Sequence, residues 1–378
     1  MLSDKSEPAR YGEARQPSET PPTVEWASGA VRILDQTRLP HAEVVLECID
    51  VASVVAAIKR LSVRGAPAIG VAGAYGVALA AALYPPSSSG AEFESAVQSL
   101  RSARPTAVNL ALMVDRVSAR AGEGPAAMLA EANRIRGEEL AASIAMGRNG
   151  ADLVAEMCGD RPVRAMTICN TGGLAAVERG TALAVIQTLH ERGSLIEAIP
   201  LETRPLLQGG RLTTWELAKM GAPHRLIVDS AAASILARGG ADVVLVGSDR
   251  VAANGDVANK IGTFSLALAA AYAQVPFIVA APETTVDTST PTGAHIEIED
   301  RGDTEVCGFG ETRFSPEGTR TINPAFDVTP VDLIAALVTD RRVVNYRTGE
   351  TLGSTPLLRT DRQSTAASAG QCSSMGGS

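Results

Sequence analysis

The strongest constraint on the fold is a series of short, β-branched apolar runs that alternate with helical segments after Arg161. The strand candidates are VRAMTIC, LIEAIPLE, RLIVD, DVVLVGSD and PFIVAAP. The helix candidates between them are GLAAVERGTALAVIQTLHERG, GRLTTWELAKMG, SAAASILARG and NKIGTFSLALAAAYAQ, each of which ends near Gly or before Pro. Strands that alternate with helices are typical of βαβ units. The pattern therefore predicts a doubly wound, Rossmann-like parallel sheet in an α/β protein.

The segment before this sheet predicts a smaller, mostly helical domain with a few short strands. Apolar residues recur at helical spacing between about Val51 and Glu156. Two alternating runs before them, VRILDQTRLP and AEVVLECID, predict a pair of strands. We expect a helical domain over residues 24–156 and a Rossmann-like catalytic domain over residues 157–358. Residues 1–23 and 359–378 have too little apolar content to offset ordering entropy, so they predict a disordered leader and tail.

Composition and charge exclude several classes of partner. The net charge of −8 over 378 residues disfavours nucleic acid or an anionic membrane as the main partner. The polar, Pro-rich opening residues predict no secretion, and the longest apolar tracts are Ala/Gly-rich, as in buried helices. Five scattered cysteines without CxxC spacing and four histidines without HxH or HExxH spacing predict neither disulfides nor a metal site. We therefore expect a cytoplasmic protein without metal, and no GxGxxG or P-loop points to a nucleotide cofactor.

Polar residues follow every predicted strand of the second domain. In an open parallel sheet, ligands bind outside the carboxyl ends of the strands. The stretches at these ends are Cys169-Asn170-Thr171-Gly172-Gly173, Glu202-Thr203-Arg204, Asp229-Ser230, Ser248-Asp249-Arg250 and Pro282-Glu283-Thr284. We expect thiol, carboxylate and guanidinium groups to converge on this one rim.

Cys169 has two interpretations. A free cysteine is most often a small buried hydrophobe. Cys169 instead ends a predicted strand and precedes the start of a Gly-rich helix, where N–H groups and the helix dipole would favour a thiolate. The following NTGG stretch can receive a phosphate through its backbone amides, although a Gly-rich turn is equally an ordinary connection.

Asp249 also has two interpretations. It follows the most apolar run of the second domain, where desolvation would raise its pKa and make it a protonated general acid. The alternative is a carboxylate that pairs with Arg250 or caps the next helix. We expect Asn259 and Lys260 to open that helix, with an amide and a cation placed for a substrate's hydroxyls or phosphate.

Several long motifs resemble the methylthioribose-1-phosphate isomerase family. They are GSDRVAANGDVANKIGT at 247–263, ETRPLLQGGRLTTWEL at 202–217, CNTGGLAAVERGTALAVI at 169–186, LDQTRLP at 34–40, RGAPAIGVAGAYG at 64–76, ARPTAVNL at 103–110 and NPAFDVTP at 323–330. The resemblance covers roughly residues 24–352 and is too extensive for chance. The family is similar in fold to the regulatory subunits of translation initiation factor 2B and to ribose-1,5-bisphosphate isomerase, so the site must discriminate between them.

The resemblance implies an aldose-ketose isomerase that converts 5-methylthioribose 1-phosphate to 5-methylthioribulose 1-phosphate in methionine salvage, without cofactor and as a homodimer. Cys169 and Asp249 would be the catalytic pair. The substrate site would be lined by Arg64, Gly65, Ala66, Arg104, Gln208, Asn259 and Lys260. Protonated Asp249 would donate to the ring oxygen while Cys169 assists hydrogen transfer between C2 and C1, either as a proton or as a hydride.

Some positions depart from the family pattern. Ile168 stands where a histidine is common, Pro200-Leu201 replace an Ala-Asp pair, and Ser248 replaces an alanine. These departures leave open another substrate, ribose 1,5-bisphosphate or 5-deoxyribose 1-phosphate. A regulatory subunit that senses a sugar phosphate or nucleotide is the non-catalytic alternative, but the presence of both Cys169 and Asp249 favours the enzymes.

Overall fold

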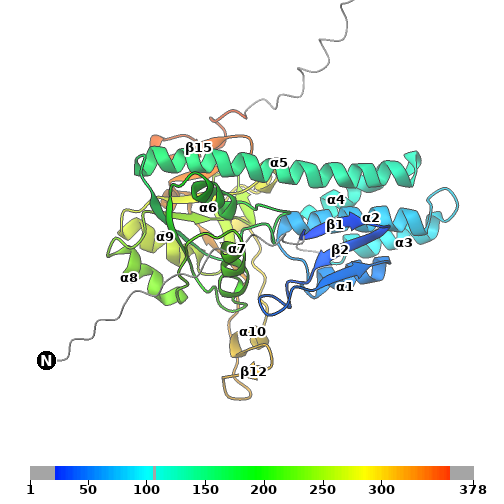
Figure 1. Ribbon diagram of the computed structural model, residues 1–378, viewed down its shortest axis with the longest axis horizontal. Coiled ribbons are helices and arrows are strands. Elements are labelled where there is room, and N and C mark those ends of the chain that lie inside the picture. The colour runs from blue at the N-terminus through cyan, green and yellow to red at the C-terminus, as the bar shows by residue number, and fades with distance from the viewer. Residues whose placement is uncertain (1–21, 105–107, 358–378) are drawn as a thin grey trace, which may run out of the picture.

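The computed structural model describes residues 22–104 and 108–357 (Figure 1). The predicted tail lies outside these residues, and so does the predicted leader except for its last two positions. Thr23 is buried and donates its hydroxyl to the carbonyl oxygen of Gly173 at 2.9 Å, so it belongs to the folded region. The domain limits drawn from the sequence stay predictions.

The first part of the chain pairs three short strands and covers them with helices. The antiparallel sheet has the order β1 (Val24–Ala27), β2 (Ala30–Leu34), β3 (Val45–Cys48). The predicted pairing of two strands here is confirmed for β2 and β3. The helices are α1 (Val51–Lys59), α2 (Ala66–Leu83), α3 (Gly90–Arg101), α4 (Val108–Ser118) and α5 (Pro125–Cys158).

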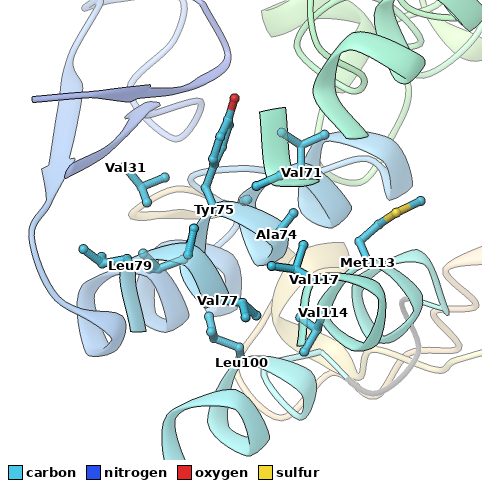
Figure 2. Close-up of a cluster of buried hydrophobic side chains, with 14 of the residues drawn as sticks. Val31, Val71, Ala74, Tyr75, Val77, Leu79, Leu100, Met113, Val114 and Val117 are labelled. Atoms are coloured by element: carbon cyan, nitrogen blue, oxygen red, sulfur yellow. The ribbon is translucent and has the colours of Figure 1, made fainter. Parts of the chain in front are cut away.

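Helix α2 is the core of this part. Every residue between 68 and 81 is buried. Its glycines let neighbouring helices approach, since a Cβ on Gly76 would lie 2.7 Å from Leu100 Cδ2 of α3. Figure 2 shows side chains of α2 packed against those of α3 and α4, among them Val71, Val77, Leu100, Val114 and Val117. By length and composition α2 could cross a membrane, but 78% of it is buried here, as expected for a core helix.

Helix α5 runs alongside both parts of the molecule (Figure 1). Its first half contributes Met128, Ala132 and Ile135 to the hydrophobic cluster around α2. Its second half contributes Ala151, Leu153 and Val154 to a cluster with α6 (Ala182–Glu191). Because one continuous helix packs into both clusters, it fixes the position of the helical part against the sheet.

The main sheet has the strand order β15-β14-β9-β6-β4-β5. The strands are β4 (Val163–Thr167), β5 (Leu195–Pro200), β6 (Val243–Val246), β9 (Phe277–Ala280), β14 (Ala336–Val338) and β15 (Val343–Asn345). All neighbours are parallel except β14 and β15, which are antiparallel. The predicted parallel sheet is confirmed.

Helices cover both faces of this sheet. Alternation along β6 shows the two faces: Val243 and Leu245 pack into the cluster with α6 and α7 (Thr214–Lys219). Val244 and Val246 pack into a second cluster with α8 (Ala232–Leu236) and α9 (Thr263–Tyr272). A sheet buried on both faces needs continuous apolar strands, which is the pattern that the sequence shows.

The strand order creates a crevice between β4 and β6. From β4 the chain moves to β5 on one side of the sheet and then returns to β6 on the other side of β4. The connections leave these two strands in opposite directions, so a gap opens at their carboxyl ends. Residues directly after β4 and β6 therefore meet in a natural ligand site.

Smaller elements surround this crevice. A second sheet has the order β10 (Val286–Asp287), β7 (Arg250–Ala252), β8 (Val257–Lys260), β13 (Phe326–Thr329). An arm formed by α10 (Asp303–Cys307), β11 (Gly308–Phe309) and β12 (Thr312–Arg313) projects from the molecule (Figure 1). Short turns complete the structure: 3-10 helices at Ala121–Glu123, Asp229–Ala231, Glu283–Thr285, Gly293–His295, Val331–Leu333 and Tyr346–Thr348, and a π-helix at Gly209–Thr213.

Three local predictions are wrong. RLIVD, at residues 225–229, forms no strand and makes only an isolated bridge between Ile227 and Leu201. The helix predicted from residue 173 starts only at α6, because Gly180 adopts a φ of 91° that no helix contains. Asn259 and Lys260 end strand β8 instead of opening a helix, since both pair with β13.

The contact between α5 and α6 gives a test of the packing. A Cβ on Gly147 would lie 2.6 Å from Thr188 Oγ1 and 2.9 Å from the carbonyl oxygen of Ala184. We expect Gly147→Ala to lower the free energy of unfolding by about 1–2 kcal/mol, because overpacking outweighs the gain in helix propensity.

Gly137 on the same helix is the matched control, since a Cβ there would meet nothing within 4 Å. Gly137→Ala should raise the free energy of unfolding by about 0.5–1 kcal/mol. Urea denaturation measures both variants. Equal effects of the two substitutions would contradict the close packing of α5 on α6.

Candidate active site

Cys169 and Asp249 lie at the crevice between β4 and β6. Cys169 comes two residues after β4, and Asp249 comes three residues after β6. Both line one cavity, whose wall also includes residues 64–67, 170–171 and 247–248, together with Asn259. The expected convergence of strand ends is met in part, because the stretches that begin at Cys169, Ser248 and Pro282 reach the cavity whereas Glu202-Thr203-Arg204 and Asp229-Ser230 do not line it.

The helical part supplies one wall of this cavity through the start of α2. Gly65 caps the helix with a φ of 85°, and a Cβ there would lie 2.3 Å from the carbonyl oxygen of Ala175. Only glycine allows this approach. The amide of Ala68 also donates to the carbonyl oxygen of Ala175, at 3.2 Å. These contacts bring Arg64 and the positive end of a long helix to the cavity, where both favour an anion.

The predicted substrate residues fall into two groups. Arg64, Gly65, Ala66 and Asn259 line the cavity. Arg104, Gln208 and Lys260 are not among its lining residues. Lys260 and Arg104 nonetheless lie near enough to act electrostatically on Asp249. Gln208 is buried, and its side-chain oxygen has no hydrogen-bond partner among the described residues.

The backbone of Cys169 is held in an uncommon conformation. Its φ is 67°, in the left-handed region that residues with a Cβ rarely adopt. Thr203 Oγ1 accepts a hydrogen bond from its amide at 2.8 Å, and Thr213 Oγ1 donates to its carbonyl oxygen at 2.7 Å. Such strain persists where surrounding contacts hold it, often at functional sites. Here two threonine hydroxyls from separate segments clamp the peptide groups on either side of the thiol.

The structure differs in one respect from the environment that the sequence predicted for Cys169. The thiol does not lie at the start of a helix, because residues 170–181 form turns and α6 begins only at Ala182. A helix dipole next to the thiol, the reason given for a thiolate from the sequence, is therefore wrong. Arg64 and Lys260 are instead the cations that interact electrostatically with the thiol.

The NTGG stretch is occupied by a carboxylate of the protein itself. Glu216 accepts hydrogen bonds from the amide of Leu174 at 3.3 Å and from the backbone of Gly173. Asn170 Nδ2 donates to the same carboxylate at 2.6 Å. Of the NTGG backbone amides expected to be available to a phosphate, that of Gly173 is thus already used, which favours the alternative that NTGG is a structural connection.

Asp249 faces four cationic side chains. Asp249 is exposed to solvent through the cavity, but the protein packed around it still desolvates its carboxyl group and raises the pKa of Asp249 above its usual range. Four cations oppose this rise in the pKa without cancelling it: Lys260, Arg64, Arg301 and Arg104. The expected raised pKa is confirmed, and it suits a general acid.

The alternative role for Asp249, an ion pair with Arg250, is not present in the structure. Arg250, its expected ion-pair partner, lies 3.7 Å from Asp287 instead. The Asp249 amide donates to the carbonyl oxygen of Ala258 at 3.0 Å, which ties the residue to the second sheet. Asp249 lines the cavity and interacts electrostatically with the four cations instead.

Two of these cations are embedded in the protein. Burial lowers the pKa of Arg64, although Cys169, Glu216 and Asp249 oppose the shift. Burial also lowers the pKa of Lys260. Lys260 donates to the carbonyl oxygen of Ala325 at 2.8 Å and lies over the ring of Phe326 at 4.8 Å. A buried cation that keeps its charge strengthens binding of an anion.

Arg301 is the cation that sequence reasoning missed. Its guanidinium lies 5.8 Å from the centre of the Phe326 ring, the ring that Lys260 also contacts. Only 11% of its side chain is exposed, and its ion pair with Glu299 is 3.5 Å long. Arg301 stands in an irregular, charged stretch of the sequence that carries no helical or strand periodicity, so no pattern pointed to it.

The positions that depart from the family pattern lie mostly outside the cavity. Ile168 and Leu201 are both buried in the hydrophobic cluster on the α8 and α9 side of the sheet. Pro200 pairs with Thr167 in the sheet. Only Ser248 lines the cavity, and its hydroxyl lies 3.4 Å from the carbonyl oxygen of Ala258. Replacement of polar family residues by Ile168 and Leu201 therefore extends the core.

Comparison with known proteins relates the chain to one family. A family model described as the initiation factor 2 subunit family matches residues 62–345. A methylthioribose-1-phosphate isomerase of Anaeromyxobacter sp. (strain Fw109-5) is 51% identical over 319 residues, which are 83% of this chain and 91% of the relative. A probable bifunctional methylthioribose-1-phosphate isomerase/methylthioribulose-1-phosphate dehydratase of Nocardia farcinica is 49% identical over 85% of this chain, which spans 58% of that relative.

Two solved structures have the same fold and substantial identity. The 5-methylthioribose 1-phosphate isomerase of Pyrococcus horikoshii is 38% identical with a TM-score of 0.81, over 89% of this chain and 95% of that one. A chain described as translation initiation factor eIF-2B, subunit delta, from A. fulgidus is also 38% identical, with a TM-score of 0.79 over 86% of this chain and 97% of that one. Fold likeness alone does not distinguish an isomerase from a regulatory subunit.

The raised pKa of Asp249 predicts a pH-dependent effect on stability. The unfolded chain ionises this carboxyl more readily than the folded protein does, so ionisation favours unfolding above the usual pKa. We expect Asp249→Asn to raise the melting temperature above that of the wild type at neutral pH. The difference should shrink as the pH falls and the wild-type carboxyl becomes protonated.

Asp242 is the matched control with the opposite sign. Burial raises its pKa, but hydrogen bonds from the Arg164 amide and the Arg161 guanidinium, both at 2.8 Å, outweigh this and hold it below the usual range. Asp242→Asn should lower the melting temperature at neutral pH, and this loss should fade on acidification. Thermal melts across pH measure both. An Asp249→Asn variant less stable than the wild type at neutral pH would contradict the desolvated carboxyl.

Proposed function

Because the chain belongs to the methylthioribose-1-phosphate isomerases of the initiation factor 2 subunit family, we propose that it converts 5-methylthioribose 1-phosphate to 5-methylthioribulose 1-phosphate, a step of methionine salvage. The observation that carries this proposal is the meeting of a thiol and a carboxyl group of raised pKa in one cavity that Arg64 lines, with three further cations near enough to act on the carboxyl group. The cations can bind the phosphate of the substrate. The isomerisation requires an acid and, next to it, a second group that assists hydrogen transfer between carbons.

The cations and the start of α2 support recognition of the phosphate. Arg64 lines the cavity, and its guanidinium can bind two phosphate oxygens at once. Gly65 and Ala66 begin a helix of 18 residues whose positive end faces the cavity. Arg104 and Lys260 add positive charge at longer range. We assign the phosphate to the Arg64 side of the cavity on these grounds.

The chemistry follows from the blocked anomeric carbon. Phosphate on the C1 oxygen prevents ordinary opening of the sugar ring to an aldehyde. We propose that Asp249 donates its proton to the ring oxygen as the bond between C1 and that oxygen breaks. Hydrogen then moves from C2 to C1 with the assistance of Cys169, and the C2 hydroxyl loses a proton as C2 becomes the ketone. That proton replaces the one Asp249 donated, so C1 is reduced, C2 is oxidised and no external redox partner is required.

Asn259 and Gln208 are proposed to orient the sugar hydroxyls. Asn259 lines the cavity and is fixed by a hydrogen bond from its Nδ2 to Thr263 Oγ1 at 3.1 Å. Gln208 does not line the cavity, so its proposed role comes from the resemblance. The homodimer and the cytoplasmic location expected from the sequence also stay predictions.

A direct assay tests the function. Purified protein is incubated with 5-methylthioribose 1-phosphate or with ribose 1,5-bisphosphate, without added metal or cofactor, and ketose formation is followed by 13C NMR. We expect a ketone signal from the first substrate only. If only ribose 1,5-bisphosphate were converted, that sugar would be the substrate in place of 5-methylthioribose 1-phosphate. Turnover of neither sugar would favour the alternative of a non-catalytic regulatory subunit.

Substitution of the proposed pair tests their roles. Cys169→Ser and Asp249→Asn should each lower kcat by a factor of about 10² to 10⁴, the usual contribution of a positioned acid or base. Cys158→Ser is the control, because Cys158 is another free thiol and lies at the end of α5. Circular dichroism checks that each variant is folded. Near-normal kcat in either site variant would remove that residue from the catalytic pair.

A further inference from the structure

Glu216 is a buried carboxylate behind the wall of the site cavity, and no role in the reaction has been given to it. It lies on α7, is 9% exposed and does not line the cavity. A Cβ on Gly172 would lie 2.3 and 2.5 Å from its two oxygens, so the chain passes as close to the carboxylate as glycine permits. Isolated buried charges are costly, so its partners must be specific.

Asn170 connects this carboxylate to the cavity. Its Nδ2 donates to Glu216 Oε1 at 2.6 Å and lies 3.2 Å from Thr213 Oγ1. Because both acceptors lie on the Nδ2 side, the side-chain oxygen of Asn170 must point the other way. On that side Arg64 donates to it. Burial raises the pKa of Glu216, while hydrogen bonds from Asn170 and the turn amides and the charge of Arg64 favour its ionised form. The ionised carboxylate accepts hydrogen bonds only, so it permits just one orientation of the Asn170 amide.

Arg64 depends on this orientation. The acceptors of its guanidinium in the described residues are the side-chain oxygen of Asn170 and the Asn170 carbonyl oxygen, at 3.3 and 3.4 Å. Its Nε is buried and has no partner within the same described residues. If the Asn170 amide flipped, an NH₂ group would face the guanidinium and displace it. Glu216 also compensates the buried positive charge of Arg64 electrostatically.

We propose that Glu216 is a positioning residue for substrate phosphate: it locks the Asn170 amide, and this amide holds the Arg64 guanidinium toward the cavity. The proposal rests on the function proposed above, in which Arg64 binds the phosphate. The competing role for Glu216 is purely structural, as an anchor for the amides of the turn at 173–174.

Glu216→Gln separates these roles. The substitution keeps the shape of the side chain but can present an NH₂ group, which frees the Asn170 amide to flip. We expect KM to rise about tenfold or more while kcat changes less than about threefold, because Arg64 binds ground state and transition state alike. The inhibition constant of inorganic phosphate should weaken by a similar factor. A structural anchor would instead lower the melting temperature and leave phosphate inhibition unchanged.

A polarity swap provides the sharper test. When Asn170→Asp is combined with Glu216→Gln, the introduced glutamine can donate to the introduced aspartate and still accept from the backbone, while the aspartate accepts from Arg64. The double variant should therefore recover phosphate inhibition and KM relative to Glu216→Gln. Failure of a folded double variant to recover, or unchanged phosphate inhibition in Glu216→Gln, would overturn the proposal.

Two controls keep the result interpretable. Glu197→Gln removes another ion-paired carboxylate of the same domain, one that pairs with Arg225 at 2.5 Å away from the cavity, and should leave KM unchanged. If Glu216→Gln does not fold, Asn170→Ala removes the same alignment without changing Glu216, and unchanged phosphate inhibition in it contradicts the proposal. If the wild-type protein has no isomerase activity, the proposed function is refuted. If the wild type is active and Glu216→Gln behaves like it, only the positioning role of Glu216 is refuted.

Discussion

A parallel sheet that is buried on both faces confines polar chemistry to the ends of its strands. Val243 to Val246 of β6 alternate between two hydrophobic clusters, so no polar side chain fits along the strand. The chain also reverses its direction of travel across the sheet at β4, which opens a crevice between β4 and β6. Cys169 and Asp249 follow these two strands by two and three residues. The position of the site thus follows from the sheet.

The remaining structure completes this crevice. Helix α2 is buried almost along its whole length, and its start reaches the crevice only because Gly65 lets the backbone approach Ala175. Helix α5 packs into the clusters on both sides of the junction and keeps the two parts in place. Arg64, which contacts Asn170, therefore links a helical region to the sheet at the point where the phosphate is proposed to bind.

Local patterns in the sequence predicted the sheet and the strand-end residues, because apolar runs and turn residues determine them directly. They did not predict that Asn259 and Lys260 lie on a strand, since this depends on pairing with β13, some 65 residues further along the chain. The hydrogen bond from Asn170 of the NTGG stretch to Glu216 likewise spans 46 residues, and spacing gave no sign of it. Arg301 comes from an irregular segment and reaches the site only through tertiary packing. The roles of Arg104 and Gln208 come from the resemblance alone, since neither lines the cavity.

The central claim is that one cavity holds the phosphate on the Arg64 side and the reacting carbons between Cys169 and Asp249. A crystal structure of the Cys169→Ser variant with 5-methylthioribose 1-phosphate bound would test this most directly. The account predicts phosphate oxygens within hydrogen-bond distance of the Arg64 guanidinium, and the ring oxygen about 3 Å from an Asp249 carboxyl oxygen. A sugar phosphate bound elsewhere, or bound here with its ring oxygen turned away from Asp249, would contradict it.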